Sequence, residues 1–190
     1  MKNIIARYEQ VAGYKVKPFG SYKRTDKAQT VTDKQKSRDH GEVFTPLWLV
    51  DEMVSKGFEE HGEKHVWLDM CAGYGAFALR ILMGLGSKHK GWNDKTPAAW
   101  SKKHLAFSEF QISSALKLLY IFGSDINLYI GDSLAMKKDM PEGIFIECSG
   151  KWYKISQPSV LKMHRWLMED YDKGLAKGEK ALELFRKKRM

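Results

Sequence analysis

The ten residues LDMCAGYGAF, 68–77, constrain the fold of this chain more than any other segment. A short apolar run ends at Asp69, turns through Gly73 and Gly75, and enters an apolar stretch at 77–85 that has helical spacing. Glycines at such a turn let a ligand lie against bare backbone, and the start of the helix adds a positive dipole end. The segment therefore predicts a strand, a glycine loop and a helix around a ligand site.

The pattern of a short apolar run followed by an acidic residue occurs twice more. Leu105-Ala106-Phe107 leads to Glu109, and the run 127–130 leads to Asp132. A further strand is expected at 143–146, and helices are expected at 47–58, 77–85, 112–122 and from 160 onward. Alternating strands and helices are typical of an open parallel sheet with its ligand at the carboxyl edge. We therefore expect an α/β fold with a Rossmann-like parallel sheet flanked by helices.

Two other stretches are harder to assign from the pattern. The polar stretch 87–103 is expected to be a loop or an irregular insertion. The C-terminal apolar positions fit one amphipathic helix, or two helices that break near Gly174 and Gly178. Only about 40 residues follow the fourth strand, so the sheet is expected to be short or incomplete, with an exposed edge that a partner chain or a C-terminal helix would cover.

The glycine pattern alone leaves the ligand open. GYGAFA fits the G-x-G-x-x-A pattern of nicotinamide-binding folds, and a single glycine match is weak. Two features argue against a dinucleotide. Asp69 precedes the first glycine, where its carboxylate can accept a hydrogen bond from an ammonium group or a water, and Glu109 lies 34 residues after Gly75 rather than about 20.

Taken together, GEVFTP at 41–46 and LDMCAGYGAF, 25 residues apart from Phe44 to Asp69, resemble the class I S-adenosylmethionine (SAM) dependent methyltransferases. The resemblance is to the N6-adenine DNA methyltransferases of restriction–modification systems, and it spans about residues 38–147. It implies that SAM is the cofactor and that the FTP segment, the glycine loop and two strand-end acids bind it. The implied cofactor residues are Phe44, Thr45, Pro46, Asp69, Ala72, Gly73, Gly75, Phe77, Glu109 and Asp132.

Each of these residues also has a structural interpretation. Phe44 and Phe77 fit plain core aromatics, Thr45 fits a helix N-cap followed by Pro46 at the first helical position, and Asp132 fits a turn. The order of the four segments, each at a strand end or a helix start, favours the cofactor interpretation.

One motif of the N6-adenine enzymes is absent. In that family the fourth strand ends in Asn/Asp/Ser-Pro-Pro-aromatic, which draws out the adenine amino group and stacks on the flipped base. Here the corresponding stretch, 144–155, reads IFIECSGKWYKI and contains no Pro-Pro. We expect any replacement for this motif to come from Glu147 and Ser149 as hydrogen-bond acceptors and from Trp152 and Tyr153 as stacking groups.

Charge divides the chain into three parts. Residues 1–40 carry ten Lys and Arg against four Asp and Glu, 41–150 carry 11 against 14, and 151–190 carry 11 against five. An acidic centre between basic ends is expected of a domain that binds a small ligand and meets a polyanion such as DNA. We predict a basic helical N-terminal arm (1–40), a SAM-binding domain (41–155) and a basic C-terminal helical segment (156–190).

The remaining features exclude several classes of protein. The 43% hydrophobic content is that of a globular chain. Cys71 and Cys148 are too few for a disulfide framework and lack zinc spacing, and the pair His61 and His65 has no third ligand nearby, so we expect no metal. The longest apolar run is 118–122, and the start lacks the apolar core of a signal peptide, so we expect a bacterial or phage-infected host cytosol.

Three functions fit these observations. The first is a compact DNA methyltransferase that transfers the SAM methyl group to adenine. The second is a catalytically inactive SAM-binding protein that binds nucleic acid or a restriction–modification partner, as a homo-oligomer or with a partner subunit. The third is methyl transfer to RNA or protein, which does not need the missing motif. The positions of residues 147–153 relative to the glycine loop separate the first function from the second.

Overall fold

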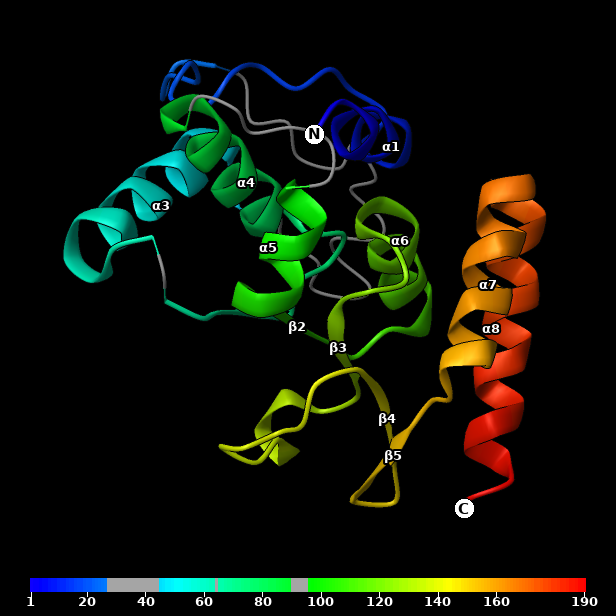
Figure 1. Cartoon of the computed structure of the whole chain (residues 1–190). Helices are drawn as coiled ribbons and strands as arrows, with labels where there is room; N and C mark the ends of the chain where they lie inside the picture. Colours follow the sequence, from blue (N-terminus) through cyan, green and yellow to red (C-terminus); the bar gives the residue numbers. More distant parts are fainter. Residues whose placement is uncertain (27–44, 64, 90–95) are drawn as a thin grey trace.

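The computed structural model describes residues 1–26, 45–63, 65–89 and 96–190 (Figure 1). It confirms an α/β fold with a mainly parallel sheet flanked by helices. In chain order the elements are α1 (Lys2–Ala12), α3 (Leu47–His61), β1 (Trp67–Met70), α4 (Ala76–Lys88), α5 (Thr96–His104), β2 (Leu105–Glu109), α6 (Ile112–Phe122), β3 (Asn127–Ile130), the 3-10 turn η1 (Ser133–Ala135), β4 (Ile144–Cys148), β5 (Lys151–Lys154), α7 (Gln157–Glu169) and α8 (Tyr171–Lys187).

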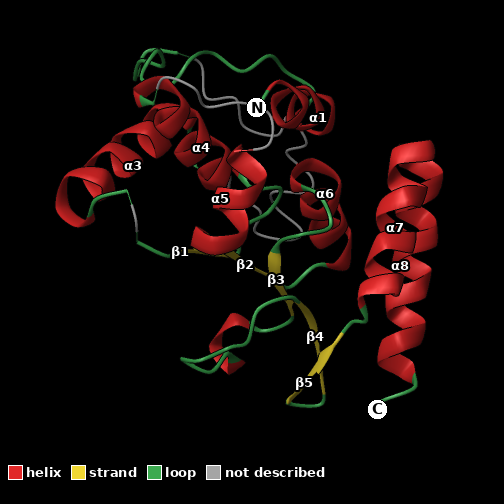
Figure 2. Cartoon of the chain, viewed as in Figure 1, coloured by secondary structure: helices red, strands yellow, loops and turns green. Residues whose placement is uncertain are grey.

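The five described strands follow one another across the sheet in the order β1-β2-β3-β4-β5 (Figure 2). The first four are parallel, and β5 returns antiparallel to β4 through a two-residue turn at Ser149 and Gly150. The mainly parallel sheet with flanking helices is compatible with a Rossmann-like fold, but the strand order does not reverse among these strands as it does in a doubly wound sheet. The carboxyl ends of β1, β2 and β3 consequently lie next to one another at one edge.

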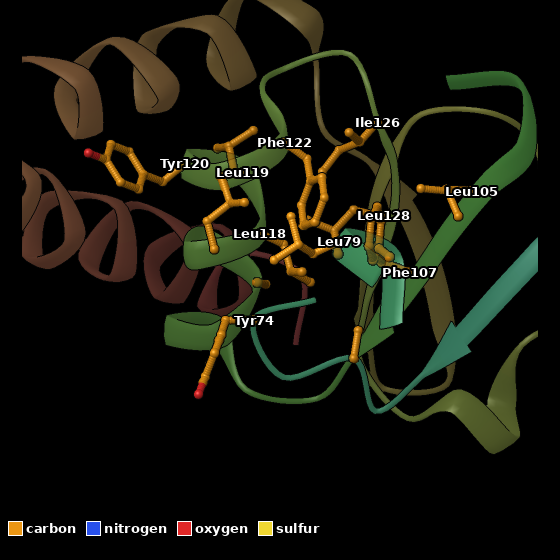
Figure 3. Packing of buried hydrophobic residues seen from close by; sticks show 14 of the residues in the cluster. Tyr74, Leu79, Leu105, Phe107, Leu118, Leu119, Tyr120, Phe122, Ile126 and Leu128 are labelled. Carbon is orange, nitrogen blue, oxygen red and sulfur yellow. The ribbon is translucent and has the colours of Figure 1, made fainter. Parts of the chain in front are cut away.

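One face of the sheet forms the main core, as the alternation of side chains along each strand requires. Phe107 of β2 and Leu128 of β3 are register partners, and both pack towards α4 and α6 (Figure 3). Leu79 of α4 and Phe122 of α6 meet them there, all almost fully buried. Burying such a side chain contributes about 1.5–3 kcal/mol, so this face supplies much of the driving force for folding.

The other face is less covered at β1, which is an edge strand of the described sheet. Leu68 and Met70 point to this face and are 49% and 59% exposed. The C-terminal helices do not cover them, because α8 packs against α6 and β4 at the opposite side of the sheet. The exposed edge expected from the short chain is therefore present, and its cover by a partner chain stays a prediction.

The N-terminal segment packs against the central domain. Tyr8 of α1 is fully buried and lies against Tyr74 of the glycine loop, with ring centroids 5.4 Å apart. Tyr120 of α6 donates a hydrogen bond to Gln10 of α1 (2.7 Å). The rest of the predicted arm, 27–40, lies outside the described residues.

Two sequence-based expectations about helices are wrong. The stretch expected to be a loop contains α5, whose helical character is hidden because its apolar residues do not recur at helical spacing. The C-terminal break lies at Asp170, whose carboxylate caps α8 by accepting from the backbone N–H of Lys173. Gly174 and Gly178 lie inside α8, where a Cβ would collide with the Trp166 carbonyl and with Leu116, so these glycines allow close helix packing instead of a break.

Candidate functional site

The carboxyl edge of β1, β2 and β3 brings three acidic residues to one place. Asp69 lies near the end of β1, Glu109 ends β2, and Asp132 follows β3 by two residues. Asp69 is in register with Phe107, so its carboxylate and that of Glu109, two residues further on, lie on the same face of neighbouring strands. The parallel sheet therefore places these strand-end acids at the same edge, as the sequence predicted.

The loop 71–75 is held against β2 by backbone hydrogen bonds. The Ala72 N–H donates to the Ser108 carbonyl (3.0 Å), and the Gly73 N–H donates to Oε2 of Glu109 (2.7 Å). Gly73 and Gly75 have positive φ angles of 55° and 87°, which glycine adopts without strain. Glu109 is thus both a strand-end acid and the group that fixes the glycine loop.

Gly75 also has a packing role that the sequence did not suggest. A Cβ at this position would lie 2.5 Å from Phe122 and 2.9 Å from Leu118, both on α6. The glycine therefore lets the start of α4 approach α6 closely, and its contact with a ligand stays a prediction.

The Asp69 carboxyl lies in a partly buried position beside Glu109. Burial, and to a smaller extent the nearby Glu109, raise the pKa of Asp69 to about 7. Its Oδ2 atom is buried and has no hydrogen-bond partner in the described part of the chain. An unpaired buried carboxylate oxygen is costly, so this position favours a ligand that brings a cation or a donor to it.

The raised pKa of Asp69 predicts a pH-dependent effect on stability. The unfolded chain ionises this carboxyl near pH 3.8 and the folded chain near 7, so the folded state is penalised as the pH rises through this interval. Asp69→Asn removes the penalty. Relative to wild type, we expect it to stabilise little at pH 4 and by about 4 kcal/mol at pH 8, because the shift is about three pKa units and one unit is worth about 1.4 kcal/mol. Urea unfolding of the ligand-free protein measures this.

Asp139→Asn, on an exposed carboxylate, is the matched control for the change in net charge. A stability difference between Asp69→Asn and wild type that stays constant from pH 4 to 8 would contradict the assignment.

A residue that the sequence reasoning missed lies next to Glu109. Phe110 is 65% exposed, although it directly follows a strand whose side chains are almost all buried. Glu109 itself accepts from the backbone N–H of Gln111 through Oε1 (2.9 Å). The signal in the sequence was the aromatic residue directly after a strand-end acid.

Asp132 and the FTP segment have local roles in the structure. Asp132 is exposed and accepts from the backbone N–H of Leu134 (2.9 Å), so it caps η1. Pro46 is the N-cap of α3, and the expectation that Thr45 caps this helix is wrong, since no side chain bonds there. Thr45 and Pro46 are half-buried, and Phe44 lies outside the described residues.

The other two loop residues are partly core residues. Ala72 is 8% exposed and belongs to the hydrophobic cluster, and Phe77 is half-buried and packs against that cluster. The structural interpretation of Phe77 as a packing aromatic therefore holds, and its cofactor role stays a prediction.

The four candidate catalytic residues lie on the β4–β5 hairpin and away from Asp69. Glu147 accepts from the Gly150 N–H, and Ser149 forms the turn with a positive φ of 52°. Trp152 donates its indole N–H to the Ala135 carbonyl (3.1 Å), whereas Tyr153 lies on the other face beneath Arg189. Because β2 and β3 lie between β1 and β4, the hairpin does not join the Asp69 site.

Comparisons with known proteins identify no family for this chain. None of the described helices combines the length and hydropathy that a bilayer-spanning segment needs. Within the described ranges, no three His, Cys, Asp or Glu residues are placed to hold a metal ion. No protein-family model matches the chain, and no curated protein or solved structure matches it either.

Proposed function

We propose that this chain binds SAM at the carboxyl edge of β1, β2 and β3, and that it acts in DNA methylation of the adenine-N6 type. One observation carries the proposal. Asp69 presents a buried, unpaired Oδ2 atom beside a glycine loop that Glu109 fixes. An amino-acid ligand with an ammonium group fits that oxygen, because a cation restores the hydrogen bond and favours the ionised carboxyl.

The other residues of the site fit the remaining parts of the same ligand. The Glu109 carboxylate, an acceptor at the end of β2, suits the hydroxyl groups of a ribose, and the exposed ring of Phe110 offers a surface on which a purine can stack. When bound, SAM supplies an electrophilic methyl group on a positively charged sulfonium. The chain contributes binding and orientation. Asp69 holds a proton in the ligand-free protein and releases it when the ligand cation binds.

The first test is calorimetry of SAM binding to wild type and to Asp69→Ala. We expect the variant to bind up to about 100-fold more weakly, because a hydrogen bond to a charged group is worth about 1.5–3 kcal/mol. Asp139→Ala, which removes an exposed carboxylate, should bind as wild type does. A wild-type protein that binds no SAM, or an Asp69→Ala variant that binds it equally well, would overturn the proposal.

The position of the hairpin favours a second candidate function. The groups expected to replace the missing proline motif are separated from Asp69 by two strands, about 14 Å at the usual strand spacing. This separation supports a SAM-binding protein that serves as a sensor or accessory subunit and transfers no methyl group itself.

Transfer of labelled methyl groups from SAM to unmethylated duplex DNA separates the two candidates. Transfer that Asp69→Ala abolishes would support the enzyme. SAM binding without transfer to DNA would support the accessory protein, and the same assay with RNA and protein acceptors tests methyl transfer elsewhere.

A further inference from the structure

Both ends of the chain carry an excess of positive charge. In the described part of the N-terminal end, three of the six cations pair with acids of the fold. These ion pairs are Lys15 with Glu9 (2.7 Å), Lys17 with Asp26 (2.9 Å) and Arg24 with Glu52 (3.5 Å). These three pairs reduce, but do not remove, the positive charge that this end offers to a polyanion.

The C-terminal end holds unpaired cations. Lys187 and Lys188 end α8, and Lys151 begins β5; all three are exposed. None of the three lies within ion-pair distance of an acidic side chain in the ranges that the structure describes. Further back along α8, Lys173 is paired with Asp170 at 3.0 Å. Lys177 and Lys180 of the same helix are exposed and, among the described residues, unpaired as well, so what distinguishes Lys187 and Lys188 is their position beside the hairpin.

The end of α8 and the β4–β5 hairpin form one surface. The guanidinium of Arg189 lies over the rings of Phe185 and Tyr153, at 3.5 and 5.3 Å from their centroids. The turn of the hairpin and the C-terminus lie at the same end of the molecule (Figure 1). Arg189 therefore joins the two elements, and the exposed lysines surround this contact.

This surface adjoins the Asp132 end of the candidate site, on the side away from Asp69. A Cβ on Gly131, directly before Asp132, would lie 2.4 Å from Cβ of Glu147 and 3.2 Å from the Trp152 ring. The hairpin that carries Lys151 is therefore packed against the turn that leads out of β3. An extended polyanion bound at the lysines would pass along the carboxyl edge of the sheet.

We propose that Lys151, Lys187 and Lys188 bind the phosphate backbone of a nucleic acid at the carboxyl edge of the sheet. This rests on the proposed function, because it places the nucleic acid next to the SAM site. A nucleic acid fits better than an anionic membrane. Most of the apolar side of α8 is occupied, with Leu182 buried and Gly178 against Leu116. The exposed apolar side chains at its end, Leu184 and Met190, are too few to form a face that inserts among lipids.

The test compares two triple variants that lose the same charge. One is Lys151→Gln/Lys187→Gln/Lys188→Gln. The matched control, Lys15→Gln/Lys17→Gln/Lys173→Gln, removes lysines that are paired with acids. We expect the first to weaken binding of a fluorescent 20-base-pair duplex about 10- to 100-fold at 0.15 M salt and to lower the salt slope by about 2–3. The control should change the affinity by less than about threefold.

Several results would contradict the proposal that this surface binds nucleic acid. Equal losses in both triple variants would show attraction by net charge alone, and wild type that binds no duplex would remove the interaction. Stronger, lysine-dependent binding to phosphatidylserine vesicles than to DNA would assign the surface to a membrane. SAM calorimetry on the triple variant of Lys151, Lys187 and Lys188 tests the SAM site separately from the DNA surface. Its SAM affinity should equal that of wild type whether or not these lysines bind DNA.

Discussion

Replacing Arg80 by methionine is expected to lower the free energy of unfolding by about 3–5 kcal/mol, because it leaves the buried charge of Asp51 without its partner. Arg80 is fully buried in α4, and both of its bonds to Asp51 are short. The guanidinium also donates to the carbonyls of Lys17 (2.7 Å) and Pro18 (3.0 Å). The variant therefore loses the contact that fixes segment 17–22 to the helices as well as the ion pair.

Urea unfolding followed by circular dichroism measures this loss. Arg165→Met, on an exposed position of α7, is the matched control and should change stability by less than about 0.5 kcal/mol. The double variant Asp51→Leu/Arg80→Met should recover much of the loss, because it leaves neither charge buried alone. A loss in Arg80→Met no larger than in the Arg165→Met control would show that the pair does not stabilise the fold.

This ion pair marks a limit of sequence reasoning. Apolar spacing correctly predicted a helix at 77–85. From the sequence alone, a single arginine within this helix would be expected at the surface. The partner of Arg80, Asp51, is 29 positions away in the sequence, and two other acceptors of the Arg80 guanidinium are backbone carbonyls. Local periodicity carries no signal for such contacts, so neither the burial of the charge nor the docking of the N-terminal segment was predictable.

The strand ends were predictable for the opposite reason. An apolar run that stops at an acid is a local pattern, and parallel pairing alone brings Asp69 and Glu109 to one edge. The order of the strands is not local. It determines that the hairpin with Trp152 pairs with β3 rather than with β1, and so places the candidate catalytic residues away from Asp69. A Ser-Gly turn between the two strands was the available signal for the hairpin.

Replacing Gly75 by alanine is expected to destabilise the protein by about 3–4 kcal/mol. Two costs combine at this position. A left-handed backbone costs a residue with a Cβ roughly 1–2 kcal/mol, and here φ is 87°. The added methyl group would also lie 2.5 Å from Phe122, so α4 and α6 must move apart in a core that tolerates overpacking poorly.

Gly150→Ala separates these two costs. Gly150 has a similar φ of 77°, and no atom lies within 4 Å of the position that its Cβ would take. We expect this control to lose about 1 kcal/mol, because it keeps the backbone strain without the steric conflict. Thermal and urea unfolding measure both variants. Equal losses would show that the φ angle alone requires glycine at position 75, whereas the expected difference assigns the glycine of this loop to helix packing beneath the site.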